Sequence, residues 1–435
     1  MELAPKQQEA IDACCDIANR VVAVSGAAGT GKTTILRQVY AALKDAGYNI
    51  ALCSPTGKAA KRIYEATGIN ALTIHKLLEF SHPGDPDPKT GKPIGFSAPK
   101  RDRQNRLEYD VILADEYAMV GHDLHRCLFD ALPSGGRVCC FGDENQLAPI
   151  EEDKRYESEP SPFQKLLNDP KNFRSIILDT VFRQGQDSGI LLNANNILKS
   201  KMPTRNDQWS QMITDQPIDA LRKLIEEVDF ERDGADNQIR FDTIDNQVLV
   251  PQNKSWVGTA KINLIMQSMY HTSAEPRIQL PRKPWVEGAD GEKGSHIWVY
   301  KGDKVICTTN NYELGVMNGE TGTIIELDTE TGEIVIDFGD REQSIPPVLM
   351  VQNKYGKLVS IDPRKEFDLA YAITVHKAQG SEYKHVIYIL NRSNMFMINR
   401  RNFYTAITRA KEHVHLIADQ QGLSNAVYRK DQIRK

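Results

Sequence analysis

The chain has 435 residues, of which 40% are hydrophobic and 26% are charged, a composition typical of a globular protein with more than one hydrophobic core. Its formal net charge of −4 excludes a histone-like polycation, although a local basic surface could still bind nucleic acid. The N-terminus lacks the basic and apolar regions of a signal peptide, and no run approaches the ~18–20 apolar residues of a membrane span, so we expect a soluble cytoplasmic protein without membrane contacts.

A parallel α/β sheet is predicted for the first part of the chain, because apolar strand-like runs alternate with helical patterns. The expected strands are Val21–Val24, Ile50–Cys53, Val111–Ala114, Val138–Phe141 and Ser175–Leu178. The segment from His82 to Glu108 is rich in proline, glycine and charge and is expected to project from the sheet, and Glu151–Pro160 is predicted to be an acidic surface loop. A second α/β series is expected to start near Ser175 and to include Val248–Pro251.

A small all-β insertion is predicted from about Thr272 to Glu366, where short strand-like runs alternate with tight turns. Within it, residues 330–332 (Glu-Thr-Gly) are expected to bound a hairpin. The strand-and-helix pattern returns at Leu369–Val375 and His385–Leu390.

The seven cysteines lie in or beside apolar helix-like and strand-like runs. They form no C-x-x-C pair. We therefore expect reduced thiols in the core rather than a zinc site or a disulfide framework.

A phosphate-binding loop is predicted between the first strand and the helix that follows it. The motif G-x-x-x-x-G-K-[ST] is formed by Gly26, Ala27, Ala28, Gly29, Thr30, Gly31, Lys32 and Thr33, followed by Thr34. The glycines let backbone N–H groups face phosphate oxygens, and the helix N-terminus adds positive potential. Lys32 would reach the β- and γ-phosphates and Thr33 would bind Mg²⁺, so the segment predicts a nucleoside-triphosphate site.

An acidic pair, Asp115-Glu116, ends the apolar run Val111–Ala114. Such a pair on its own is commonly a solvated strand end. In a chain with a phosphate loop, Asp115 would hold Mg²⁺ through water, and Glu116 would orient or deprotonate the attacking water. The two motifs together predict a fold that hydrolyses nucleoside triphosphates.

Ten segments, in order, resemble those of a superfamily 1B DNA helicase of the RecD/Dda type, and they span residues 3–413. They are LAPKQQEAI, GAAGTGKTT, SPTGKAAKRI, TIHKLL, LADEYAMV, GDENQLAPI, LDTVFRQ, GVMNGETGTI, YAITVHKAQGSE and FYTAITRAKEH. The resemblance implies two RecA-like α/β domains, 1–178 and 179–271 with 367–435, that bind ATP and Mg²⁺ between them. It also implies a pin or wedge insertion at 81–108 and an SH3-like β-barrel insertion at 272–366.

The resemblance extends the ATP site to Gln7, Gln146, Arg183, Arg409, Gly380 and Glu382. Gln7 matches a glutamine that reads adenine, whose edge requires a group that both donates and accepts. Gln146 matches a γ-phosphate sensor. The two arginines match cations that stabilise the charge of phosphoryl transfer, and the last two residues match a loop that faces the nucleotide, with Glu382 toward the ribose.

The remaining motif residues are expected to face nucleic acid: Thr56, Gly57, Lys58, Thr73, His75, Asn253, Lys254, Thr374, His376 and Lys377. Hydroxyl, backbone N–H and ammonium groups placed after strands can contact phosphates. The two histidines have no further ligand at metal spacing, so no metal is expected there. From Tyr371 to the C-terminus, Lys and Arg greatly outnumber acids, as a strand-tracking groove requires. Phe96 is expected either to stack on a base as the tip of a strand-separating pin or to anchor its loop to the domain.

The function implied by the resemblance is that of an ATP-dependent DNA helicase that moves 5′→3′ on single-stranded DNA and unwinds duplex at single-strand/double-strand junctions. A monomer is expected, with a single-strand-binding or replication protein as a candidate partner. The alternatives are an RNA helicase or a protein-stripping translocase of the same superfamily, and a nucleotide-gated binding module with negligible turnover. Glu116 and the two arginines favour the motor over the gated module.

Overall fold

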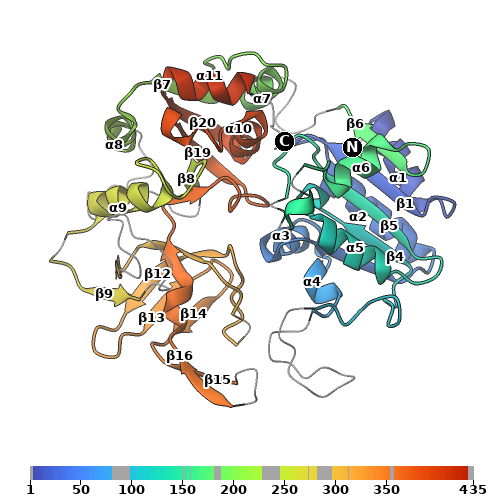
Figure 1. The fold of residues 1–435 in the computed structure, drawn as a ribbon, viewed down its shortest axis with the longest axis horizontal. Helices are drawn as coiled ribbons and strands as arrows, with labels where there is room; N and C mark the ends of the chain where they lie inside the picture. The colour runs from blue at the N-terminus through green and yellow to red at the C-terminus, as the bar shows by residue number, and fades with distance from the viewer. Residues whose placement is uncertain are drawn as a thin grey trace. The chain divides into compact units, whose positions relative to one another are not determined.

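The structure, a computed structural model, describes residues 3–80, 98–149, 151, 153–156, 158–180, 188–227, 245–272, 274–281, 296–311, 313–352 and 357–429. It contains two compact units (Figure 1): unit 1 is built on Met1–Ser188, and unit 2 on Gly189–Asn353 and Lys357–Asp431. Within the described residues, no helix is both long enough and apolar enough to cross a membrane.

Unit 1 contains a six-stranded parallel sheet. In spatial order its strands are β3 (Leu72–Thr73), β2 (Ile50–Ser54), β4 (Val111–Ala114), β5 (Arg137–Gly142), β1 (Val21–Gly26) and β6 (Arg174–Leu178). The five expected strands are confirmed, and β3 is an additional short edge strand. The expectation that a second series starts near Ser175 is wrong, because β6 pairs with β1 and its Ile176 and Leu178 pack into the core of the first sheet.

Helices cover both faces of this sheet (Figure 1). They are α1 (Pro5–Cys15), α2 (Lys32–Asp45), α3 (Gly57–Thr67), α4 (Ile74–Leu77), α5 (His122–Asp130) and α6 (Pro162–Asn168), with the 3-10 turns η1 (Tyr117–Met119) and η2 (Lys154–Tyr156). Successive strand residues point to opposite faces. Val22 and Val24 therefore pack into a core with α1, α2 and α3, whereas Ala23 packs into a core with α4, α5 and α6.

Unit 2 contains a five-stranded parallel sheet. In spatial order its strands are β18 (Ala372–Thr374), β8 (Asn246–Val250), β19 (Tyr383–Leu390), β20 (Ala410–Ala418) and β7 (Trp209–Ile213). The helices of this unit are α7 (Gly189–Leu198), α8 (Pro217–Glu227), α9 (Thr259–Tyr270), α10 (Arg400–Ile407) and α11 (Gln420–Tyr428), with the 3-10 turns η3 (Pro363–Glu366) and η4 (Arg392–Asn394). The two parallel sheets confirm the predicted α/β class.

An antiparallel part of unit 2 follows α9, as the sequence predicts. Its five-stranded sheet has the order β14 (Glu342–Ile345), β13 (Ile334–Asp337), β12 (Thr321–Leu327), β11 (Lys304–Cys307) and β17 (Phe367–Leu369). Two further antiparallel pairs are β9 (Arg277–Leu280) with β10 (Ile297–Tyr300) and β15 (Leu349–Gln352) with β16 (Leu358–Ile361). The predicted hairpin turn joins β12 and β13, and Gly332 adopts there the positive φ of 80° that a side chain would oppose.

Asp303 ties the antiparallel part to the parallel sheet. This fully buried carboxylate accepts hydrogen bonds from the Tyr371 hydroxyl at 2.7 Å, from Gln267 Nε2 of α9 at 2.6 Å and from the backbone N–H of Tyr300 at 2.8 Å. Burial, and then the nearby Asp303 charge, raise the pKa of Tyr371. A buried charge needs such partners, so the junction has a defined geometry.

Several other expectations concern the chain as a whole. The seven cysteines are free thiols, as predicted, and five of them are buried. Residues 81–97, which include Phe96 and most of the predicted pin, lie outside the described residues, as does Arg183. The domain limits at 178/179 and 271/272 stay predictions.

Candidate functional site

The phosphate loop of unit 1 runs from the end of β1 into α2. Gly29 and Gly31 have φ values of 81° and 82°, which only glycine adopts readily. A Cβ on Gly26 would lie 2.4 Å from Thr30 Oγ1, so this position also has no room for a side chain. The motif glycines are therefore required by the shape of the loop.

Lys32 is held over this loop, because its Nζ donates to the carbonyl oxygens of Gly26 at 2.6 Å and Ala27 at 3.1 Å. Thr33 and Thr34 follow in the first turn of α2. The ammonium and the N-terminus of α2 thus lie together, as a phosphate site requires.

Gln7 lies against the same loop from α1, and only 4% of it is exposed. Its Nε2 donates to the Thr30 carbonyl at 3.0 Å, and its Oε1 accepts from the backbone N–H of Ala4 at 3.1 Å. A Cβ on Gly31 would lie 2.5 Å from Gln7 Nε2. The structure places Gln7 at the loop, and its role with adenine stays a prediction.

The acidic pair follows β4, two strands from β1 in the sheet. Asp115 Oδ1 accepts from the backbone N–H of Glu116 at 2.8 Å, and Glu116 has a φ of 51° and a ψ of 36°, a left-handed conformation that is rare outside glycine. Burial, and then the Glu116 charge, raise the pKa of Asp115 to about 6, while the nearby charge of Lys32 opposes this shift. The Lys32 ammonium therefore lies close enough to the Asp115 carboxylate for its charge to act on it.

Gln146 belongs to the loop after β5, the strand between β1 and β4. Its backbone N–H donates to the Asp143 carbonyl at 3.2 Å, and the N–H of Glu144 donates to Ser25 Oγ of β1 at 3.3 Å. Only 3% of Gln146 is exposed. The three predicted motifs thus meet at the carboxyl edge of one sheet.

Two buried oxygens at this edge, Glu116 Oε2 and Gln146 Oε1, accept no hydrogen bond within the described part of the chain. Leaving such an acceptor buried costs about 1–3 kcal/mol, so oxygens of this kind commonly serve a ligand or a reacting water. Together with the Lys32 ammonium and the Asp115 carboxylate, they fit a magnesium–nucleoside triphosphate. Thr33 and Asp115 are the residues that would hold the ion.

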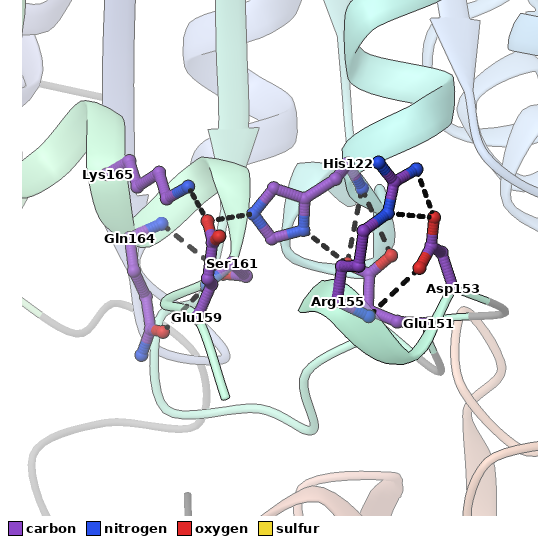
Figure 2. Close-up of polar contacts among 8 residues, drawn as sticks. All are labelled: His122, Glu151, Asp153, Arg155, Glu159, Ser161, Gln164 and Lys165. Atoms are coloured by element: carbon purple, nitrogen blue, oxygen red, sulfur yellow. Dashed lines mark hydrogen bonds and ion pairs between the residues drawn. The ribbon is translucent and has the colours of Figure 1, made fainter. Parts of the chain in front are cut away.

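A polar cluster anchors the segment that follows Gln146 (Figure 2). Its residues are His122, Glu151, Asp153, Arg155, Glu159, Ser161, Gln164 and Lys165. His122, at the start of α5, contacts Glu151 Oε1 through Nδ1 at 2.7 Å and lies 3.8 Å from Glu159 through Nε2, and its ring stacks on Tyr156. The prediction of an acidic surface loop is wrong for Glu151, whose side chain is 11% exposed because His122 pairs with it.

The predicted DNA-facing residues of unit 1 follow β2 and β3, which are neighbours in the sheet. Thr56 caps α3 by accepting from the N–H of Ala59 at 3.2 Å, and Gly57 and Lys58 form the first turn of that helix. Thr73 caps α4, and His75 in the same turn is exposed, with its ring 4.8 Å from Phe80.

The predicted nucleotide-facing residues of unit 2 lie together. Arg409, 3% exposed, follows α10 and donates to the carbonyl oxygens of Thr405 at 3.2 Å and Ser381 at 3.3 Å. Ser381 lies between Gly380, which has a φ of 75°, and Glu382, whose carboxylate pairs with Lys411 at 3.7 Å. Arg409 is therefore fixed to the predicted nucleotide-facing loop.

The predicted DNA-facing residues of unit 2 follow β8 and β18, which are also neighbours. Asn253 and Lys254 are exposed, and Asn253 Oδ1 accepts from Thr259 Oγ1 at 3.0 Å. Thr374 Oγ1 accepts from the N–H of Lys377 at 3.3 Å, and burial lowers the pKa of both His376 and Lys377. The two segments lie at one edge of the sheet.

The structure also shows two exposed aromatic residues at this edge that the sequence analysis did not identify. Trp256, 48% exposed, donates through Nε1 to Asn391 Oδ1 at 3.3 Å, and Phe396, 81% exposed, follows shortly after in the loop beyond β19. Asn394 Nδ2 donates to Ser255 Oγ at 2.9 Å, which joins the two segments. An aromatic residue beside the motif PQNKS is the signal that could have found Trp256. No pattern marks Phe396.

Three family models match the chain. An AAA domain matches residues 2–208, the SH3 domain of ATP-dependent RecD-like DNA helicases matches residues 284–338, and a UvrD-like helicase C-terminal domain matches residues 369–417.

Curated relatives extend the match over most of the chain. The "ATP-dependent RecD2 DNA helicase" of Deinococcus radiodurans is 29% identical over 402 residues, 91% of this chain and 46% of the relative. The "RecBCD enzyme subunit RecD" of Mycolicibacterium smegmatis is 26% identical over 438 residues, 93% of this chain and 70% of the relative. The chain thus spans about half the length of the first relative and about 70% of the second.

Solved structures share the fold. A structure of two Pif1 helicases at forked double-stranded DNA has a TM-score of 0.60 at 19% identity, with 98% of this chain and 94% of that chain covered. Pif1 from Bacteroides, with ADP-AlF3 and single-stranded DNA, has a TM-score of 0.59 at 20% identity, with 96% and 92% covered.

Proposed function

We propose that this chain is a RecD-like ATP-dependent DNA helicase of superfamily 1B, as its matches to the AAA domain, the RecD-like SH3 domain and the curated RecD2 relative support. It moves 5′→3′ on single-stranded DNA and separates duplex at single-strand/double-strand junctions, as a monomer. Its candidate partner is a single-strand-binding or replication protein.

The observation that carries this proposal is the meeting of three motifs at one sheet edge, with the unpartnered oxygens of Glu116 and Gln146 buried there. Buried acceptors are usually paired, so two unpaired oxygens beside the phosphate loop support a ligand there. A phosphate-binding switch would not need a carboxylate held in a left-handed turn beside the aspartate that we propose binds the metal. This geometry supports turnover rather than gated binding.

Each residue of the ATP site has a proposed task. Glu116 accepts a proton from the attacking water, Lys32 neutralises the phosphates, and Gln146 contacts the γ-phosphate. Mg²⁺, held by Thr33 and Asp115, would neutralise phosphate charge. Arg183 and Arg409 supply cations for the transition state, and Gln7, Gly380 and Glu382 bind the adenosine part.

The residues proposed to face DNA lie at the carboxyl edges of the two sheets. In unit 1 these are Thr56, Gly57, Lys58, Thr73 and His75, and in unit 2 they are Asn253, Lys254, Thr374, His376 and Lys377. Hydroxyl and ammonium groups there would contact phosphates. Phe96 is the proposed tip of the strand-separating pin.

The test is steady-state ATP hydrolysis with and without single-stranded DNA, for the wild type and Glu116→Gln. The wild type is expected to hydrolyse ATP much faster with DNA. The Gln variant keeps the shape of the side chain but cannot accept the proton, so it should lose at least 10²-fold in kcat while it retains single-strand affinity. A wild type whose ATPase is unaffected by DNA would refute the motor.

A further inference from the structure

A hollow on unit 1 has no part in the proposed ATP site. Its volume is about 690 Å³, and its lining contains four arginines and one acid: Arg20, Arg103, Arg106, Arg174 and Asp130. Because the whole chain carries a net charge of −4, this local excess of positive charge is not a general property of the surface. We name it the arginine hollow.

The arginine hollow lies at the edge of the sheet opposite the phosphate loop. Arg20 immediately precedes β1, Gly136 immediately precedes β5, and Arg174 begins β6, and the starts of neighbouring parallel strands share one edge. At about 3.3 Å per residue, the five steps from Val21 to Gly26 place the hollow roughly 16 Å from the phosphate loop. Its arginines therefore do not serve the nucleotide.

The guanidinium groups of the hollow have N–H donors that remain available to a ligand. Arg20 is exposed, and its side chain makes no hydrogen bond or ion pair within the described residues. Arg103 pairs with Asp130 at 2.9 Å, and Arg174 pairs with Glu9 at 2.7 Å. Each guanidinium has five N–H donors, so even the paired arginines have N–H groups left over.

The lining also offers apolar surface, from Phe129, Leu132 and Phe173. Both phenylalanines are only partly buried. Guanidinium forks match phosphate oxygens, and aromatic rings stack on bases. Single-stranded nucleic acid carries both phosphates and free base faces, whereas a duplex hides its base faces in the stack.

We propose that the arginine hollow is a second binding site for single-stranded DNA, separate from the DNA-facing residues at the carboxyl edges. This inference rests on the proposed function, which brings DNA to the chain. A junction offers two single strands of the same chemistry, the strand on which the protein moves and the strand that it displaces. The experiment distinguishes these two sources.

The test measures affinity by fluorescence anisotropy, without nucleotide, for three DNAs: a plain oligonucleotide, a duplex with one 5′ tail, and the same duplex with a second, non-complementary tail on the displaced strand. The variants are Arg20→Gln, which removes an arginine whose side chain has no partner among the described residues, and Arg20→Gln/Arg174→Gln. The control is Arg37→Gln, since Arg37 is an exposed residue of α2 outside the hollow, and its side chain likewise makes no hydrogen bond or ion pair in the described part of the chain.

The wild type and the control should bind the two-tailed junction about fivefold more tightly than the one-tailed duplex, and Arg20→Gln should abolish most of this difference. Loss of one phosphate contact should also reduce the slope of log K against log salt by about 0.7. Single-strand-stimulated ATPase should stay at the wild-type rate. Equal weakening on all three DNAs would also support the site, with the tracked strand as its occupant.

Unchanged affinity of both hollow variants for every DNA would overturn the inference. The same assay with a labelled acidic peptide that contains phenylalanine provides a second check. If the hollow variants lost affinity for this peptide but kept wild-type affinity for every DNA, the hollow would serve a protein partner and the inference would be overturned. These failures differ from failure of the proposed function, in which DNA would not stimulate the wild-type ATPase at all.

Discussion

Two features of Glu116 are unfavourable for the stability of the folded chain and are unusual for a residue with only a structural role. Its left-handed backbone is disfavoured for a side chain with a Cβ by roughly 1–2 kcal/mol. One of its carboxylate oxygens is also buried without a hydrogen-bond partner among the described residues. The turn is held by the Asp115 carboxylate, which accepts the Glu116 N–H at 2.8 Å. Asp115 thus has two tasks in the proposal, to hold the ion and to aim its neighbour.

Phe396 is expected to stack on a DNA base. It is 81% exposed, beside the segment that carries Asn253 and Lys254. Base–aromatic stacking contributes about 1–3 kcal/mol, so Phe396→Ala should weaken single-strand Kd by roughly five- to 150-fold. Folding should be unaffected because the ring is exposed. Fluorescence anisotropy with a short oligonucleotide measures the change.

The matched control for Phe396 is Leu192→Ala, which removes an exposed apolar side chain from α7 of the same unit. This variant should bind DNA like the wild type. If Phe396→Ala and Leu192→Ala had the same affinity, Phe396 would not be a DNA contact.

At the scale of elements, the segment between β5 and α6 is held to α5 by one histidine. His122 is 10% exposed and pairs with Glu151, while Glu159 lies on its other side and also pairs with Lys165 (Figure 2). This segment also contains Gln146, the proposed γ-phosphate sensor. The cluster is therefore suited to fix the loop in which the sensor lies.

His122→Ala should loosen this segment. The change removes the imidazole partner of the Glu151 carboxylate but keeps the backbone N–H of residue 122, which donates to it at 3.2 Å, so the expected cost is about 0.5–1.5 kcal/mol. Hydrogen exchange should become faster in residues 153–161, with smaller changes in the strands. Arg126→Ala is the control on the same helix, because Arg126 forms an exposed pair with Asp123. Equal exchange in the wild type and His122→Ala would show that the cluster anchors nothing.

Elements were predictable where a local pattern determines them. The strands that precede the phosphate loop and the acidic pair are short apolar runs, and their boundaries agree with prediction within one or two residues. The sequence predicted β6 as a strand of the first sheet but also placed the start of the second series near Ser175, and only the first expectation holds, because the pairing partner of a strand depends on chain topology, which its own residues do not encode. The burial of Glu151 was predicted wrongly and the exposure of Phe396 was not predicted at all, because both depend on the folded structure and not on a local sequence pattern. The burial of Glu151 depends on a histidine 29 residues away, and an exposed phenylalanine has no sequence pattern.

At the scale of the whole molecule, buried histidines couple stability to pH. Burial, assisted by the nearby His413 and His385, lowers the pKa of His415 to about 3, and burial lowers that of His125 to about 4. The folded chain keeps these rings neutral, whereas the unfolded chain takes up protons below about pH 6.5. The free energy of unfolding should therefore fall as pH drops from about 6.5 toward 3–4.

His415→Gln should make unit 2 less sensitive to acid. It removes one group that binds a proton on unfolding, so the slope of the unfolding free energy against pH should decrease by about 1.4 kcal/mol per pH unit in this range. Urea unfolding at pH 4.5 and pH 5.5, followed by a probe in unit 2, measures the slope. An unaltered slope in His415→Gln would contradict the role of His415.

The central claim is that ATP hydrolysis at the carboxyl edge of unit 1 drives strand separation. The most direct measurement follows strand release from a duplex with a 5′ single-stranded tail and from one with a 3′ tail, in ATP, with the wild type and Glu116→Gln. The account predicts that the wild type separates the 5′-tailed duplex and that Glu116→Gln binds both DNAs but separates neither. Separation of the 3′-tailed duplex alone would contradict the polarity. Failure to separate either duplex, or separation by Glu116→Gln at the wild-type rate, would contradict the account itself.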